Sequence, residues 1–124
     1  MAFKYSLECR NAGLDARIAA IGPRPILKIY ASAQGSKSTD ELISMALPAE
    51  WMGKAKNGTV MSAGEWKGRA IADGEAKSFR IYDRSGDTCH IEGAIPDEMK
   101  LDNRDIATDQ TVTVAEFTIR SGNG

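Results

Sequence analysis

The side chains with the clearest chemical potential are two cysteines, Cys9 and Cys89, and one histidine, His90. A structural zinc site needs four ligands, commonly paired at short spacing, and Cys9 lies far along the chain from the other two. Neighbouring residues of a strand point to opposite faces, so Cys89 and His90 are poorly placed to act as nucleophile and base. We therefore expect no metal and no cofactor, with Cys89 packed as a small apolar side chain and His90 a polar surface residue.

Other motifs that carry chemistry are weak or missing. The segment from Asp83 to Asp87 holds two carboxylates and a glycine but lacks the ligand spacing of a calcium loop, and it predicts a hairpin tip. Glycine-rich phosphate loops and the G-x-S-x-G nucleophile motif are absent from the sequence. A disulfide between Cys9 and Cys89 stays open, although two cysteines are too few for a disulfide scaffold. The sequence therefore predicts a protein that is not an enzyme.

A second group of side chains combines aromatic and basic residues on predicted strands. Trp66, Lys67 and Arg69 occur on one such segment, and Arg80 and Tyr82 occur on another. One interpretation is a carbohydrate- or ligand-binding face that also uses His90. The other is an alternating strand whose polar face lies in water or against another subunit, and we favour this second interpretation.

Composition limits the classes of protein to which the chain can belong. The 124 residues are 42% hydrophobic and 27% charged, which is typical of a globular protein. This length predicts a single domain over 1–124. Sixteen basic and seventeen acidic residues give a net charge of −1, which argues against nucleic-acid binding. No signal segment and no apolar run of membrane-spanning length is present, so we expect no membrane partner and folding in the cytoplasm.

The elements that position these side chains follow from hydrophobic periodicity. Residues from about 6 to 21 predict a helix whose apolar face carries Leu7, Leu14, Ile18 and Ile21, with Gly22-Pro23 as its end. Strands are predicted from about 25 to 120. Their ranges are 26–31, 41–47, 59–61, 65–72, 77–83, 88–95 and 111–120, separated by loops at 33–40 and 96–104 and by an irregular segment at 49–58.

The strand patterns also predict which side chains face the core. Tyr30 is expected to face outward, and Cys89 is expected to share a face with Ile91. The last strand changes phase between Val114 and Phe117, which predicts a β-bulge near Ala115 or Glu116. Seven or eight short strands with frequent turns favour a mainly β fold. We expect a small β-sandwich, with the jelly-roll type among the candidates, and one N-terminal helix.

The chain also resembles a known family along most of its length. The segments that carry the resemblance are Arg10–Ala16, Pro25–Tyr30, Leu47–Met52, Gly64–Trp66, Phe79–Asp83, Thr88–Gly93, Leu101–Asn103, Gln110–Val114 and Phe117–Ile119. In this order they resemble a family of small structural proteins of tailed-bacteriophage virions. The chain departs from the family at Asp109, where a glycine usually precedes the Gln-Thr-Val run. This departure affects only a turn.

The resemblance implies a structural role in a virion and no catalytic residues. We expect a capsid decoration or cement protein that binds the major capsid protein or another virion protein, stabilises the shell and forms a homo-oligomer. A tail, baseplate or fibre-associated protein is the first alternative, and a carbohydrate- or ligand-binding module is the second. The side chains that we expect to contact the partner are Trp51, Met52, Trp66 and Tyr82.

Overall fold

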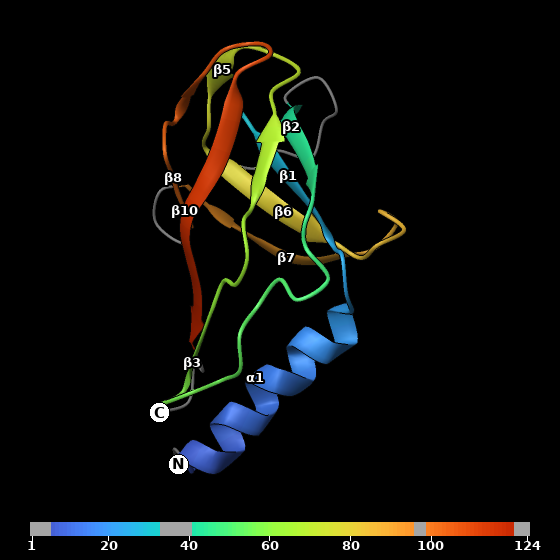
Figure 1. Ribbon diagram of the computed structural model, residues 1–124, viewed down its shortest axis with the longest axis vertical. Helices are drawn as coiled ribbons and strands as arrows, with labels where there is room; N and C mark the ends of the chain where they lie inside the picture. Colours follow the sequence, from blue (N-terminus) through green and yellow to red (C-terminus); the bar gives the residue numbers. More distant parts are fainter. Residues whose placement is uncertain (1–5, 33–40, 96–98, 121–124) are drawn as a thin grey trace.

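The computed structural model describes residues 6–32, 41–95 and 99–120. It consists of one N-terminal helix and two antiparallel sheets that pack face to face, with a small third sheet at one end (Figure 1). The prediction of a mainly β fold with one helix is therefore confirmed. The predicted loop at 33–40 lies outside the described residues.

Helix α1 spans Leu7–Ile21, close to the predicted bounds. The Ser6 side chain caps its first turn by accepting a hydrogen bond from the Cys9 backbone N–H, and Gly22 ends it with a φ of 87°. Leu14 and Ile21 are buried, as the apolar stripe predicted. Leu7 belongs to the same face but lies in the first turn, two turns away from Leu14, and 42% of its surface stays exposed.

The ten strands of the described residues fall into three sheets. Sheet A has the order β2 (Glu41–Ala46), β1 (Ile26–Tyr30), β6 (Ser78–Tyr82), β7 (Cys89–Ala94). The second sheet has the order β3 (Thr59–Met61), β10 (Thr111–Arg120), β4 (Lys67–Arg69), and β8 (Met99–Leu101) also pairs with β10. The third contains β5 (Gly74–Glu75) and β9 (Asp105–Ile106). A bridge between Ile43 and Ala70 joins the first two sheets along one side.

Aliphatic and aromatic side chains from both main sheets fill one core. Leu27 and Ile29 of β1 and Ile81 of β6 alternate inward with no measurable exposure, as their strand periodicity predicted. Two tilted ring contacts, Trp51 with Trp66 and Trp66 with Phe117, cross this core at centroid distances of 6.0 and 5.6 Å. Full burial of a side chain such as that of Leu27 or Ile29 stabilises the fold by about 1.5–3 kcal/mol relative to exposure.

Strand β10 contains the predicted irregularity. Its register with β8 shifts between Val114 and Glu116, so the residue between them is extra. The bulge lets Val112, Val114 and Phe117 all face the core although their spacing breaks the period of two. The prediction of a bulge near Ala115 or Glu116 is confirmed.

Three other predictions about strands differ from the structure. The segment 65–72 forms only the short strand β4, since the chain turns at 71–72 to reach the third sheet. Gly74, which lies between the predicted strands 65–72 and 77–83, begins β5 and pairs with Ile106. The predicted loop over 96–104 contains β8, which Met99 anchors in the core. These pairings join segments far apart in sequence, so local periodicity carried no signal for them.

Candidate functional site

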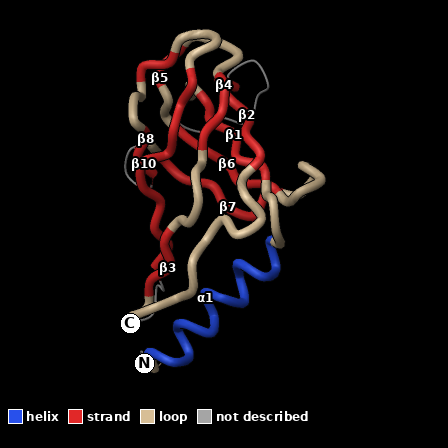
Figure 2. The backbone as a smooth tube through the Cα atoms, in the orientation of Figure 1, coloured by secondary structure: helices blue, strands red, loops and turns tan. Residues whose placement is uncertain are grey.

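Three of the four expected contact residues are core residues. Trp51, Met52 and Trp66 have 1%, 7% and 2% of their surface exposed. The indole N–H of Trp51 donates to the Gly22 carbonyl at 3.0 Å, and that of Trp66 donates to the Ala63 carbonyl at 3.0 Å. The Trp51 bond therefore ties the 47–58 loop to the end of α1, and Trp51 and Met52 present almost no surface to a partner. Figure 2 shows this loop as a tan tube that passes α1 before it reaches β3.

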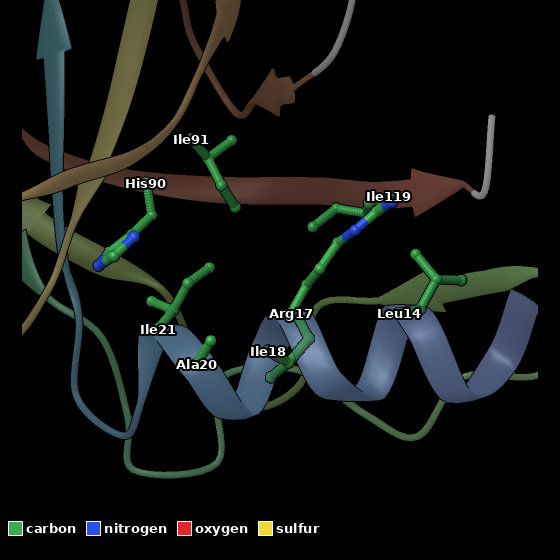
Figure 3. A pocket seen from close by; sticks show the side chains of 8 residues that line it. All are labelled: Leu14, Arg17, Ile18, Ala20, Ile21, His90, Ile91 and Ile119. Carbon is green, nitrogen blue, oxygen red and sulfur yellow. The ribbon is translucent and has the colours of Figure 1, made fainter.

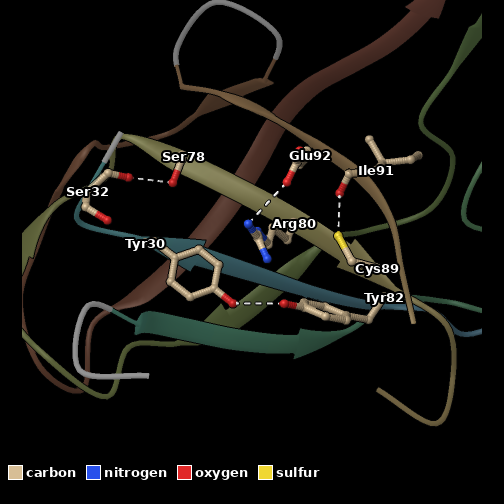
Figure 4. Close-up of polar contacts among 8 residues, drawn as sticks. All are labelled: Tyr30, Ser32, Ser78, Arg80, Tyr82, Cys89, Ile91 and Glu92. Carbon is tan, nitrogen blue, oxygen red and sulfur yellow. Dashed lines mark hydrogen bonds and ion pairs between the residues drawn. The ribbon is translucent and has the colours of Figure 1, made fainter. Parts of the chain in front are cut away.

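The fourth residue, Tyr82, lies on the outer face of sheet A beside Tyr30 and Arg80 (Figure 4). The hydroxyls of Tyr82 and Tyr30 meet at 3.4 Å, and Arg80 pairs with Glu92 at 3.2 Å. Tyr30 is on the outer face as predicted, yet only 3% of its surface is exposed. Burial, and then the hydrogen bond with Tyr82, raise the pKa of the Tyr30 phenol, so it remains protonated at neutral pH.

A second ion pair extends this outer face toward β2. The Lys28 ammonium lies 3.3 Å from the Glu41 carboxylate and 5.4 Å from the centre of the Tyr82 ring. Together with Arg80 and Glu92, these groups satisfy one another within sheet A. The outer face is therefore a polar surface whose charges are already paired, and its ion pairs organise the sheet more than they offer charge to a ligand.

The aromatic and basic residues that the sequence suggested as one face do not come together. Trp66 is in the core, while Lys67 and Arg69 are on β4, which pairs with β10 rather than with sheet A. Lys67 forms its own exposed ion pair with Glu65 at 3.3 Å. The residues suggested for carbohydrate binding are therefore separated. Trp66 is in the core, Arg80 and Tyr82 are on the outer face of sheet A, and His90 lines a hollow between α1 and β7 that is described below.

A bulge in β7 separates Cys89 from His90. Ile91 pairs with Ile81 and Cys89 pairs with Tyr82, so His90 is an extra residue between them. The prediction that Cys89 shares a face with Ile91 is wrong, because the extra residue turns Cys89 to the outer face (Figure 4). Burial raises the pKa of the Cys89 thiol, and the thiol donates to the Ile91 carbonyl at 3.4 Å, so it stays protonated and weakly nucleophilic.

The remaining sequence motifs have structural roles in the described residues. Asp83 accepts hydrogen bonds from the Ser85 hydroxyl at 2.6 Å and the Asp87 backbone N–H at 3.2 Å, which closes the predicted β6–β7 hairpin. Cys9 and Cys89 are both free thiols. No cluster of metal-ligating side chains occurs within 6–32, 41–95 and 99–120. Over the same ranges, no helix is long and apolar enough to span a bilayer.

An apolar hollow with Arg17 and His90 at its edge lies between α1 and strands β7 and β10. We call it the α1–β7 groove (Figure 3). It has a volume of about 330 Å³. Its apolar lining consists of Leu14, Ile18, Ile21, Ile91 and Ile119, and its polar lining consists of Arg17 and His90, with Ala20 at the helix side. The groove exists because α1 crosses the open end of the sandwich without filling it.

Hydrogen bonds from the 47–58 loop hold α1 in this position. The Gly58 backbone N–H donates to the Asn11 side-chain oxygen at 2.8 Å, and the Ala55 N–H donates to the Asp15 carboxylate at 2.9 Å. Both acceptors lie on the side of the helix that meets the loop. These bonds fix the helix against the loop, while Ile21 and part of Ile18 line the hollow beside β7.

The sequence does not predict this groove. Its patterns indicate that Ile18, Ile21 and Ile119 are apolar positions and that His90 is a polar one, but they do not show that these residues from different elements lie together. The helix stripe alone predicts burial against some surface, and it does not show that the partner strands stop short of the helix. The β7 bulge, which turns His90 into the groove, had no local sequence signal.

Comparison of the chain with models of protein families, with curated proteins and with solved structures finds no match to any of them.

Proposed function

We propose that this chain is a structural protein of a tailed-bacteriophage virion and acts as a capsid decoration protein. It binds the major capsid protein or another virion protein on the outside of the shell and stabilises the particle. The resemblance of the chain, segment by segment, to small virion proteins supports the assignment to a virion. The observation that supports an attachment role is the α1–β7 groove, an open hollow lined mainly by aliphatic side chains.

The groove suits attachment because it offers apolar surface that water solvates poorly. Five branched aliphatic residues line it, and burying them against a partner removes their apolar area from water. Many copies bound at equivalent positions on a symmetric shell lower the free energy of the assembled particle by mass action. Copies could also contact one another on the shell, as a homo-oligomer.

The outer face of sheet A does not support the same role as strongly. Its charged side chains are already engaged in the ion pairs Lys28–Glu41 and Arg80–Glu92. A partner that docked there would need to replace those interactions with its own. The aliphatic groove carries no such cost, so we place the attachment surface at the α1–β7 groove.

Particles assembled without this protein test the proposal. We expect them to lose infectivity faster on heating and on osmotic shock than complete particles, and added purified protein restores their resistance. Equal resistance of the two kinds of particle contradicts shell stabilisation. The copy number separates the shell from the tail: the shell requires on the order of hundreds of copies, whereas a tail or baseplate component is present in far fewer.

A further inference from the structure

The ionisable side chains that line the α1–β7 groove are all basic. Arg17 and His90 are its two ionisable lining residues, and none of the residues that line it is acidic. The ion pairs of the described residues join Lys28 with Glu41, Lys67 with Glu65 and Arg80 with Glu92, so none of them involves Arg17. Figure 3 shows the Arg17 side chain rising from α1 toward Ile119 at the edge of the groove. Within the part of the chain that the structure describes, the groove therefore offers an aliphatic floor and a guanidinium that joins no ion pair.

The strand that borders the groove stands at the end of its sheet. In the order β2-β1-β6-β7, strand β7 pairs on one side with β6. His90 and Ile91 of β7 line the groove, so an extended segment that enters it passes alongside a sheet edge. Terminal strands recruit extended peptides because the main chain supplies hydrogen bonds and alternate side chains enter a pocket. The bulge at His90 limits such pairing to the residues after it.

We infer that the α1–β7 groove binds an extended segment of a partner protein that carries aliphatic side chains and a carboxylate. The aliphatic side chains enter between Ile18, Ile21 and Ile91, and the carboxylate pairs with Arg17. The inference rests on the proposed function for the identity of the partner, a virion protein, while the chemistry of the segment follows from the groove. A volume of about 330 Å³ is at the small end for binding pockets, which suits a few side chains of one segment.

Two variants change the groove without removing a core residue. Arg17→Glu reverses the charge at its edge, and Ala20→Glu places a carboxylate on its helix side. Both residues are exposed, so the fold should be unaffected. The matched controls are Arg69→Glu, an exposed arginine on β4, and Ala16→Glu, an exposed alanine on α1 that does not line the groove. Thermal unfolding of all four variants checks that each is folded.

The probe is a library of random twelve-residue peptides selected for binding to the wild-type protein. We expect the selected peptides to share alternating aliphatic residues and at least one Asp or Glu. The affinity of a labelled selected peptide, measured by fluorescence anisotropy, should fall about tenfold in Arg17→Glu and in Ala20→Glu, because like charges then face each other. It should change less than about twofold in the two controls.

Three results overturn the inference. One is a selection that gives no shared pattern, and another is a peptide that binds Arg17→Glu and Ala20→Glu as tightly as the wild type. The third is decanoate binding the groove at a lower concentration than any selected peptide, which assigns the groove to a lipid-like anion instead of a protein segment.

Co-sedimentation with purified virions separates this inference from the proposed function. If Arg17→Glu and Ala20→Glu co-sediment with virions as fully as the wild type, the α1–β7 groove is not the binding surface. That result leaves the virion role unaffected. If the wild type does not co-sediment, the virion role is contradicted. The peptide selection then tests independently whether the groove binds an extended segment.

Discussion

At the scale of the residue, the turn before β10 has a backbone conformation that the sheets alone would not impose. Asp109 adopts a φ of 70°, in the left-handed region, in the turn that leads into β10. Its backbone N–H donates to the Ala70 carbonyl at 2.9 Å, so the turn also ties β10 to the end of β4. Glycine is the residue that such a left-handed turn accommodates most easily.

Substitutions at Asp109 test this conformation. Asp109→Gly should raise the free energy of unfolding by less than about 1 kcal/mol, since glycine enters the left-handed region without a Cβ clash. Asp109→Val should lower it by about 1–2 kcal/mol, because a β-branched residue fits that region poorly. Urea unfolding of the three proteins gives the comparison. A valine variant as stable as the wild type would show that the turn is not left-handed.

Asp73 gives a prediction about pH. Hydrogen bonds from the Thr108 backbone N–H at 2.6 Å and the Thr108 hydroxyl at 2.9 Å lower the pKa of its carboxyl. The resulting stabilisation is present above the unfolded-state pKa of about 3.9 and is lost as pH falls through the lower folded-state value. In Thr108→Val the backbone donor remains and the hydroxyl is lost, so the pKa should rise part of the way toward its ordinary value.

An NMR titration of the side-chain carboxyls measures this effect. Asp83 serves as the internal control, because the Ser85 hydroxyl is the main cause of its own lowered pKa and Thr108 does not touch it. A Thr108→Val protein in which the Asp73 pKa is unchanged would refute the role of the hydroxyl.

At the scale of the element, the sheets approach each other closely where β4 lies beside β2. A Cβ added at Gly68 would lie 2.8 Å from the Met45 Cβ and 3.4 Å from the Ile43 Cδ1. Glycine is needed here because the neighbouring strand occupies the space, not because of its backbone angles. By contrast, a Cβ at Gly13 of α1 would meet nothing within 4 Å.

The two glycines therefore make a matched pair of substitutions. Gly68→Ala should lower the free energy of unfolding by about 1–3 kcal/mol through overpacking. Gly13→Ala should raise it by up to about 1 kcal/mol, since alanine favours the helix. Chemical denaturation measures both. If the two changes have the same sign, the close approach of β4 to β2 is wrong.

The elements differ in how far the sequence could predict them. The helix, its Gly22 end, the hairpin at Asp83–Asp87 and the bulge in β10 all have local signals, and each is present. The pairing of β5 with β9 depends on contacts distant in sequence, and it has no local signal. The β7 bulge depends on the register of the β6–β7 hairpin, which the residue pattern of β7 alone does not show. The burial of three of the four expected contact residues has a related cause. Large aromatic residues such as Trp51 and Trp66 suit a contact surface and a core equally well, and only tertiary packing places them in the core.

At the scale of the whole molecule, one core connects the helix with both main sheets. Leu14 and Ile21 of α1 belong to the same buried cluster as Trp51 and Trp66. The helix is therefore packed on the sandwich through the core as well as through its hydrogen bonds with the 47–58 loop. We expect α1 and the sheets to unfold together.

Urea unfolding followed by two signals tests this cooperativity. Tryptophan fluorescence reports the core around Trp51 and Trp66, and far-UV circular dichroism reports the helix and the sheets. The two transitions should coincide, with the same midpoint and slope. A circular dichroism transition that precedes the fluorescence change would show that α1 detaches first, and the α1–β7 groove would then not be a fixed surface.

The attachment of this protein to a virion is the central claim, and sedimentation measures it most directly. Purified labelled protein is mixed with tailed-phage particles that were assembled without the protein, and the mixture is centrifuged. We predict saturable co-sedimentation at a fixed stoichiometry on the order of hundreds of copies per particle, as equivalent sites on a symmetric shell require. Protein that stays in the supernatant at every concentration would contradict the account.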